Sequence, residues 1–190
     1  MLPRSFYFLR HGETDWNKEH RLQGSIDIPL NENGREQARL AIPILQKYPI
    51  DRIISSPLSR AFETAQIINE VLQKPLSTDV RLREKSFGEF EGRTAEELEL
   101  WRKENPQPDA DMFLSSPPGG ETPQQVQDRI ISFKTEILNL YPDNILFVAH
   151  GGIYRSLCYA LGQDLTKSPN AQPFQFVRHA PMEWALVNLK

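Results

Sequence analysis

The stretch FYFLRHGET, residues 6–14, joins an apolar run to a polar turn that contains a histidine. The stretch ILFVAHGG, residues 145–152, repeats this arrangement far along the chain. Short apolar runs of this kind are typical of buried strands in a parallel sheet. In open α/β sheets the carboxyl ends of parallel strands lie at one edge, and ligands bind there. We therefore expect His11 and His150 to meet at one edge of a sheet.

Helix-start signals and apolar periodicity predict alternating strands and helices in the rest of the chain. Asn31 is placed to cap one helix, and Thr94 and Thr122 each open a capping box. The dipeptide Ser56-Pro57 predicts a further helix start, with Ser56 as the cap and Pro57 in the first turn. Strands are expected over residues 4–10, 52–55, 78–82, 145–149, 174–178 and 183–189, and helices over residues 32–47, 57–73, 95–103, 123–140 and 152–161.

This alternation predicts an α/β fold, a three-layer α/β/α sandwich with a mostly parallel central sheet. The chain has 190 residues, which is the length of a single domain over residues 1–190. Residues 85–120 carry a short helical pattern and many prolines and glycines. We expect them to form a small helical and loop insertion, a cap over the carboxyl ends of the strands.

Charge and composition narrow the class of partner. The formal net charge is −3 and 39% of the residues are hydrophobic, which argues against nucleic acid or an anionic membrane as the partner. No stretch is long enough to span a membrane, and the apolar run near the start is too short for a signal peptide. We expect a cytoplasmic enzyme, and the composition leaves its oligomeric state open.

Six segments in order make a more specific pattern. They are RHGETDWN (residues 10–17), QGSIDIPL (23–30), SPLSRAFETA (56–65), LREKSFGEFEG (82–92), GGET (119–122) and AHGG (149–152). Together they resemble the signature of the histidine phosphatase superfamily, which includes the cofactor-dependent phosphoglycerate mutases. The resemblance implies an enzyme that transfers phosphoryl groups of small phosphorylated metabolites.

The resemblance also implies a role for each matching residue. His11 is similar to the nucleophile that forms a phosphohistidine, and Glu84 to the general acid. Phosphoryl transfer needs charge stabilisation on the transferring oxygens, and arginine offers a planar fork that matches them. The implied set is Arg10, His11, Arg60, Glu84 and His150 for catalysis, with Asn17, Gln23, Gly24 and Gly151 as substrate contacts.

The resemblance implies no catalytic or substrate-binding role for several other polar and aromatic residues. The histidines lack zinc-site spacing and the single cysteine, Cys158, lies in an apolar helical pattern, so we expect no metal, no other cofactor and a buried, inert thiol. His20 and His179 match no motif. The aromatic residues Trp16, Phe87 and Phe90 could line the mouth of the site or serve only in packing.

Hydrolases and mutases of this family share the same pocket. The residues of the segment 85–120 therefore provide the evidence that distinguishes between the two activities. Mutases of this family have a Tyr where this chain has Phe87 and a Lys where it has Ala95. They also carry a pair of arginines further along the chain. In this chain, residues 104–120 contain no Lys or Arg and instead carry Asp109 and Asp111. A substrate carboxylate would lack its partner there, which favours a phosphatase. Two alternatives remain. The first is a mutase whose contacts to the substrate carboxylate come from Arg83, Lys85, Arg93, Arg102 or Lys103. The second is a binding protein on the same fold that has lost catalysis. The second is disfavoured, because no residue of the implied catalytic set is missing from this chain.

Overall fold

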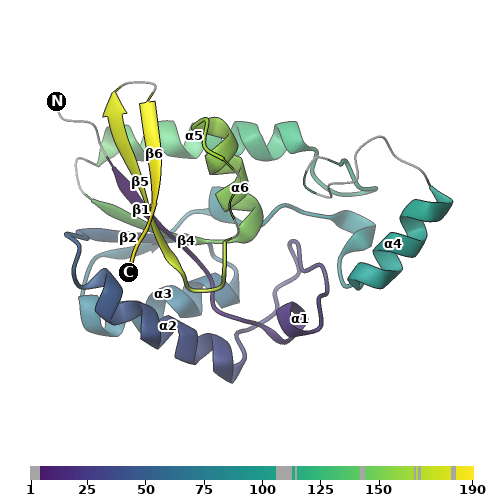
Figure 1. Ribbon diagram of the computed structural model, residues 1–190, viewed down its shortest axis with the longest axis horizontal. Helices are drawn as coiled ribbons and strands as arrows, with labels where there is room; N and C mark the ends of the chain where they lie inside the picture. Colours follow the sequence, from purple (N-terminus) through teal and green to yellow (C-terminus); the bar gives the residue numbers. More distant parts are fainter. Residues whose placement is uncertain are drawn as a thin grey trace.

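The computed structural model describes residues 5–105, 113, 115–141, 144–164, 166, 168–180 and 183–190. Its centre is a six-stranded sheet with the order β3-β2-β4-β1-β5-β6 (Figure 1). The strands are β1 (Phe6–Arg10), β2 (Arg52–Ser55), β3 (Leu76–Thr78), β4 (Ile145–Ala149), β5 (Pro173–Ala180) and β6 (Glu183–Asn188). The first four strands in this order run parallel, while β5 pairs antiparallel with β1 and β6 pairs antiparallel with β5. The α/β class is confirmed, with a mixed sheet whose antiparallel part is the C-terminal hairpin.

Helices cover both faces of this sheet (Figure 1). The helices are α2 (Glu32–Leu45) and α3 (Ser59–Leu72) on one face, and α5 (Pro123–Leu140) and α6 (Gly151–Ala160) on the other. Each face has its own apolar core, because β1 and β4 send alternate side chains to opposite sides. Leu9 and Val148 pack toward α2 and α3, whereas Phe8 and Phe147 pack toward α5 and α6. This burial fixes where β1 and β4 end, and so where His11 and His150 emerge.

The insertion between β3 and β4 lies to one side of the sheet (Figure 1). Its described part contains the 3₁₀ turn η2 (Gly88–Phe90) and helix α4 (Ala95–Glu104), which begins with the predicted capping box at Thr94. A small separate cluster of Phe87, Phe90 and Leu98, with Leu22 from the N-terminal loop, holds this region together. Phe90 packs edge-on against Trp101 with 4.6 Å between ring centroids. Phe90 therefore serves packing.

The structure differs from the sequence prediction in three local details. Ser56 caps no helix, because α3 begins at Ser59 with Leu58 in the cap position and no side-chain cap bond. The strand expected over residues 78–82 is instead the end of β3 followed by a 3₁₀ turn, η1 (Val80–Leu82), which Asp79 caps. Between β1 and α2, where no element was expected, lies a one-turn helix, α1 (Asp15–Lys18), which begins with a capping box between Thr14 and Asn17. Among the described helices, none is both long and apolar enough to cross a membrane.

Candidate active site

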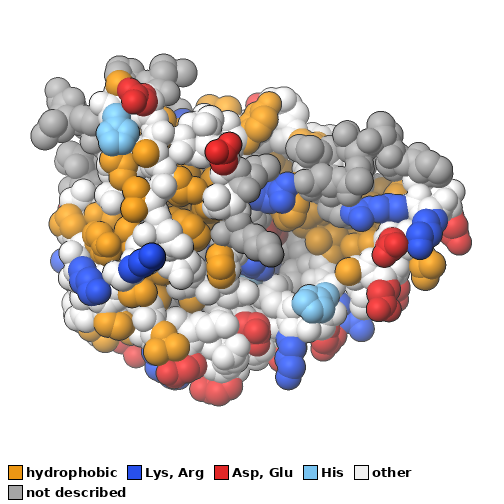
Figure 2. Space-filling model, viewed as in Figure 1, with side chains coloured by type: hydrophobic (Ala, Val, Ile, Leu, Met, Phe, Trp, Pro, Cys, Tyr) orange, Lys and Arg blue, Asp and Glu red, His pale blue; other side chains and the backbone are white. Residues whose placement is uncertain are grey.

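A cavity of about 370 Å³ opens at the carboxyl ends of β1 and β4, between the start of α6 and the insertion. The space-filling view shows the surface hollowed between the sheet and the α4 side of the molecule (Figure 2). The predicted site residues that line it are Arg10, His11, Asn17, Gln23, Gly24, Arg60, Glu84 and Gly151. His150 lies behind this wall, with its ring centroid 5.1 Å from that of His11. The fold thus brings together residues that are far apart in the sequence.

The ring of His11 is buried and has a defined tautomer. Its Nδ1 lies 2.7 Å from the backbone oxygen of Gly12. A carbonyl oxygen can only accept, so Nδ1 carries the proton and donates it. Burial, followed by the charges of Arg60 and Arg10, lowers the pKa of His11 well below its ordinary value. The imidazole is therefore neutral near pH 7, and its Nε2 keeps the lone pair that a nucleophile needs.

The backbone around His11 is tightly packed. A Cβ on Gly12 would lie 2.2 Å from the backbone oxygen of Gly34 in α2, so only glycine fits there. The Gly12 amide donates to Thr64 in α3, and Asn170 donates through Nδ2 to the backbone oxygen of His11. Contacts from three separate parts of the chain therefore fix the backbone that carries the His11 ring.

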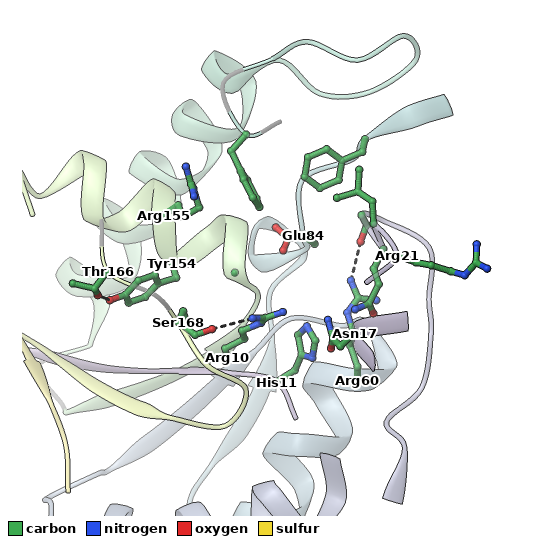
Figure 3. Close-up of a pocket in the computed structure, with 16 residues that line it drawn as sticks. Arg10, His11, Asn17, Arg21, Arg60, Glu84, Tyr154, Arg155, Thr166 and Ser168 are labelled. Atoms are coloured by element: carbon green, nitrogen blue, oxygen red, sulfur yellow. Dashed lines mark hydrogen bonds between the residues drawn. The ribbon is translucent and has the colours of Figure 1, made fainter. Parts of the chain in front are cut away.

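Two arginines flank this ring, of which Arg60 is buried and Arg10 is partly buried (Figure 3). Arg60 is fully buried, and its two terminal nitrogens donate to the backbone oxygens of Ile26 and Gly24, each at 2.8 Å. Arg10 donates through Nη1 to the backbone oxygen of Ser168 at 2.9 Å. Burial lowers the pKa of Arg60 to about 10, so it remains charged at neutral pH. The Nε atoms of both arginines are buried without a hydrogen-bond partner among the described residues. An anion in the cavity would satisfy such donors.

His150 follows β4 directly, in the cap position of α6, and contacts a residue that follows the neighbouring strand. Its Nε2 lies 2.8 Å from the hydroxyl oxygen of Ser56, which follows β2. Its Nδ1 is buried and has no partner within the described part of the chain. Burial, followed by the charges of Arg60 and His11, lowers the pKa of His150 well below its ordinary value. His150 is therefore neutral near pH 7.

The carboxyl group of Glu84 lies on the opposite wall of the cavity (Figure 3). Its Oε2 accepts from the Gly152 amide at 3.0 Å, and its Oε1 accepts from the Lys85 amide at 2.9 Å. A Cβ on Gly152 would lie 2.3 Å from Oε1, so this glycine makes room for the carboxyl group. Two backbone donors thus orient a potential proton donor toward the cavity.

The remaining predicted contacts come from the loop after β1. Asn17 accepts through Oδ1 from the Thr14 amide at 3.2 Å and from Nδ2 of Asn170 at 3.3 Å. The side-chain oxygen of Gln23 is buried without a partner among the described residues. Gly24 has a φ of +56°, in the left-handed region that favours glycine. Its carbonyl oxygen accepts from Arg60.

Sequence reasoning missed seven further residues that line the cavity: Arg21, Leu22, Phe113, Tyr154, Arg155, Thr166 and Ser168. Arg155 follows Gly151 by four residues on α6, and this helical spacing could have placed it on the same side of the helix. Thr166 and Ser168 lie in the segment between α6 and β5, where no motif marks them.

None of the five basic residues considered for a mutase lines this cavity. Lys85 is buried and donates through Nζ to the backbone oxygens of Phe113 and Ser115, at 3.0 and 2.6 Å. Lys103 pairs with Glu99 on the exposed side of α4. Asp109 and Asp111, which made the insertion acidic, lie outside the described residues.

Other sequence expectations concern metals and packing. Across the ranges that the structure describes, no group of three His, Cys, Asp or Glu residues is arranged to hold a metal ion. Cys158 is buried, as expected, and burial raises the pKa of its thiol to about 11. Phe87 lines the cavity and is almost fully buried, whereas Trp16 is not among the lining residues.

Comparison with known proteins settles the family. The model of the histidine phosphatase superfamily (branch 1) matches residues 6–176. The chain belongs to the histidine phosphatase superfamily. This confirms the family expected from the six segments.

Individual relatives agree with this assignment. The uncharacterized phosphatase PhoE of Bacillus subtilis is 36% identical over 150 residues, which cover 78% of this chain and 72% of the relative. The structure of mycobacterial glucosyl-3-phosphoglycerate phosphatase with VO3 has a TM-score of 0.85 and 31% identity, and covers 97% of this chain and 98% of that one. A phosphoglycerate mutase from Thermus thermophilus has a TM-score of 0.75 and 30% identity, covering 98% of each chain. Histidine phosphatases similar to this one thus include proteins named as phosphatases and as mutases.

Proposed function

We propose that this histidine phosphatase hydrolyses small phosphomonoesters through a phosphohistidine on His11. The observation that carries the proposal is the fixed tautomer of His11, with Nδ1–H bound to Gly12 and the ring between Arg10 and Arg60. A neutral imidazole beside two guanidinium cations suits attack on a phosphate, whose oxygens the cations stabilise. We further infer a cytoplasmic enzyme of one domain, with residues 85–120 as a cap over the site.

In the first step, the Nε2 lone pair of His11 forms a bond to phosphorus and the bond from phosphorus to the ester oxygen breaks. The departing alkoxide takes a proton from the Glu84 carboxyl group. Arg10, Arg60 and His150 stabilise the charge on the transferring oxygens, and the backbone donors at the start of α6 add to this stabilisation.

In the second step, water attacks the phosphorus of the phosphohistidine. The Glu84 carboxylate accepts a proton from that water as the bond between nitrogen and phosphorus breaks. Inorganic phosphate leaves, and the hydrogen bond to Gly12 again holds the proton on Nδ1 of His11. No net proton is lost from Glu84, so the site is ready for another turnover.

The described part of the cavity favours hydrolysis over mutase activity. A mutase must keep its substrate bound so that the phosphohistidine returns its phosphoryl group to it. The basic residues first considered for that task do not line the cavity. The B. subtilis and mycobacterial relatives carry phosphatase names, which supports the same choice.

The test is to follow 3-phosphoglycerate by ³¹P NMR in the presence of a bisphosphoglycerate primer. We expect inorganic phosphate to accumulate much faster than the 2-phospho isomer. The His11→Ala variant should lose several orders of magnitude in turnover, while its far-UV circular dichroism stays that of the wild type. Isomer formation with kcat/KM on the order of 10⁵ M⁻¹s⁻¹ would assign the protein to the mutases instead.

A further inference from the structure

The segment between α6 and β5 contacts the loop that carries the nucleophile. Ser168 accepts through its backbone oxygen from Nη1 of Arg10 at 2.9 Å, and the Ala171 amide donates to the backbone oxygen of Arg10 at 3.0 Å. Asn170, which lies between these two contacts in the chain, donates through Nδ2 to the backbone oxygen of His11 at 2.9 Å and to Oδ1 of Asn17 at 3.3 Å. One side chain thus contacts both the nucleophilic residue and a residue of the cavity wall.

The residue that follows Asn170 has a strained backbone. Ala171 has a φ of +52°, in the left-handed region, which is unfavourable for residues other than glycine. It is buried, and its amide is bound to Arg10. Residues other than glycine keep such a conformation where surrounding contacts impose it, and such residues gather at functional sites. The strain at Ala171 therefore accompanies a turn that brings Asn170 to the end of β1.

The amide group of Asn17 has one defined orientation. Its Oδ1 accepts from the Thr14 amide at 3.2 Å, from the Thr14 hydroxyl group at 3.3 Å and from Nδ2 of Asn170. A backbone amide can only donate, so the side-chain atom of Asn17 that it contacts is the oxygen. This orientation leaves the NH2 group of Asn17 for the cavity, which Asn17 lines beside His11 (Figure 3). An NH2 group there can donate to a phosphate oxygen.

We propose that Asn170 is a positioning residue, which holds the backbone of His11 and keeps the NH2 group of Asn17 turned toward the phosphoryl group. The inference rests on the proposed phosphatase function, because it takes the cavity beside His11 to be the phosphate site. Asn170 is not among the residues that line the cavity, so it acts through the two residues that it contacts.

The experiment changes the chemistry of Asn170 while keeping its size. Asn170→Asp replaces the NH2 donor by a carboxylate oxygen, which repels the oxygens of His11 and Asn17. Asn170→Ala removes the side chain without adding a charge. Each variant is also made in an Asn17→Ala background. Two quantities are measured, the Kd for inorganic phosphate by isothermal titration calorimetry and kcat/KM for p-nitrophenyl phosphate.

Gln172→Ala is the matched control for the stability of this segment. Gln172 lies two residues after Asn170, and its side chain donates at the C-terminal hairpin to Pro173, Asn188 and Leu189. We expect both quantities to stay within about twofold of the wild type in this control, because a substitution away from the site changes them little.

We expect Asn170→Asp to weaken phosphate binding by about tenfold or more, a factor that one hydrogen bond to a charged group can supply. Asn170→Ala should show smaller losses in the same direction. In the Asn17→Ala background, the loss of phosphate affinity caused by Asn170→Asp should shrink to about threefold or less, because residues that act together are not additive. The value of kcat/KM should still fall in that background, since the contact with the His11 backbone is lost as well.

Other outcomes would overturn the positioning role. A loss of phosphate affinity that is equal with and without Asn17, or equal in Gln172→Ala, would mean that Asn170 only stabilises the segment. An unchanged affinity in both Asn170 variants would mean that it does not affect the site. If Asn170→Asp does not fold, Asn170→Ala takes its place in the comparison. A wild type that binds phosphate but hydrolyses no phosphomonoester would refute the proposed function, while the phosphate affinities would still test the role of Asn170.

Discussion

The hydroxyl group of Ser56 contacts the ring of His150 and orients it. Removing this hydroxyl group tests whether the orientation of His150 matters for catalysis. Ser56→Ala removes the partner 2.8 Å from Nε2 of His150 and leaves a buried ring nitrogen unsatisfied. We expect kcat/KM to fall by about tenfold or more, since an unsatisfied buried polar group costs roughly 1–3 kcal/mol. The matched control is Ser55→Ala, which removes a buried hydroxyl bonded only to backbone oxygens. Similar losses from both variants would show that Ser56 serves stability and not the site.

The hydrogen-bond partner of Ser56 could not be predicted from the sequence. Its position before Pro57 has every mark of a helix cap, and the site residues around it were correctly expected at one edge of the sheet. The local pattern contains no information about His150, which is 94 residues away and competes for the same hydroxyl group. Side chains that leave strand ends can be placed from motifs, but the hydrogen bonds that orient them depend on packing.

The Gly152 amide, in the first turn of α6, donates a hydrogen bond to the Glu84 carboxyl group. A change at Gly152 should therefore impair proton donation by Glu84 more than the other steps of the reaction. In Gly152→Ala the new Cβ would lie 2.3 Å from Oε1 of Glu84, so the carboxyl group must move. Loss of a positioned general acid typically costs roughly 10²–10⁴-fold, and least when the leaving group is stable as an anion. We therefore expect kcat/KM to fall at least about tenfold more for an alkyl phosphate than for p-nitrophenyl phosphate. In Gly151→Ala the nearest atom is 3.7 Å away, and its loss should be much smaller and equal for both substrates.

Helices with clear end signals were the parts best predicted from sequence. The capping boxes at Thr94 and Thr122 and the cap at Asn31 each begin a helix as expected. The one-turn helix α1 was missed, because four residues give no apolar periodicity. The segment after β3 was misread as strand, because Asp79 turns the chain there by capping Arg81.

The two buried histidines should make the stability of the whole molecule depend on pH. Their pKa values are lowered by burial first and by neighbouring charges second, so the folded state resists their protonation. The unfolded chain takes up these protons near pH 6.5, and stability is therefore lost as the pH falls below that value. Between pH 6.5 and 5.5 the loss should be about 1 kcal/mol per histidine. The free energy of unfolding is measured in urea across this pH range for the wild type and for a His11→Gln/His150→Gln variant. An equal pH dependence in the two proteins would show that these histidines are not its source.

Viewed across the molecule, the class of fold and the central site residues were predictable, while the outer wall of the cavity was not. Strand ends and motifs place Arg10, His11 and His150, because a parallel sheet brings strand ends to one edge. Arg155 and Thr166 reach the cavity through the packing of α6 and the segment that follows it. That packing depends on contacts between residues that are distant in the chain.

Trapping the phosphoryl group on the protein tests directly whether His11 forms a phosphohistidine. Wild-type enzyme is mixed with ³²P-labelled phosphomonoester, quenched within milliseconds in base, and digested for mass mapping. We expect a label that is stable to base, labile to acid, and carried by the peptide with His11, at a level that rises and decays as turnover proceeds. His11→Ala should show no label. A label on another residue, or steady hydrolysis by wild type with no label at any time, would show that His11 is not the nucleophile.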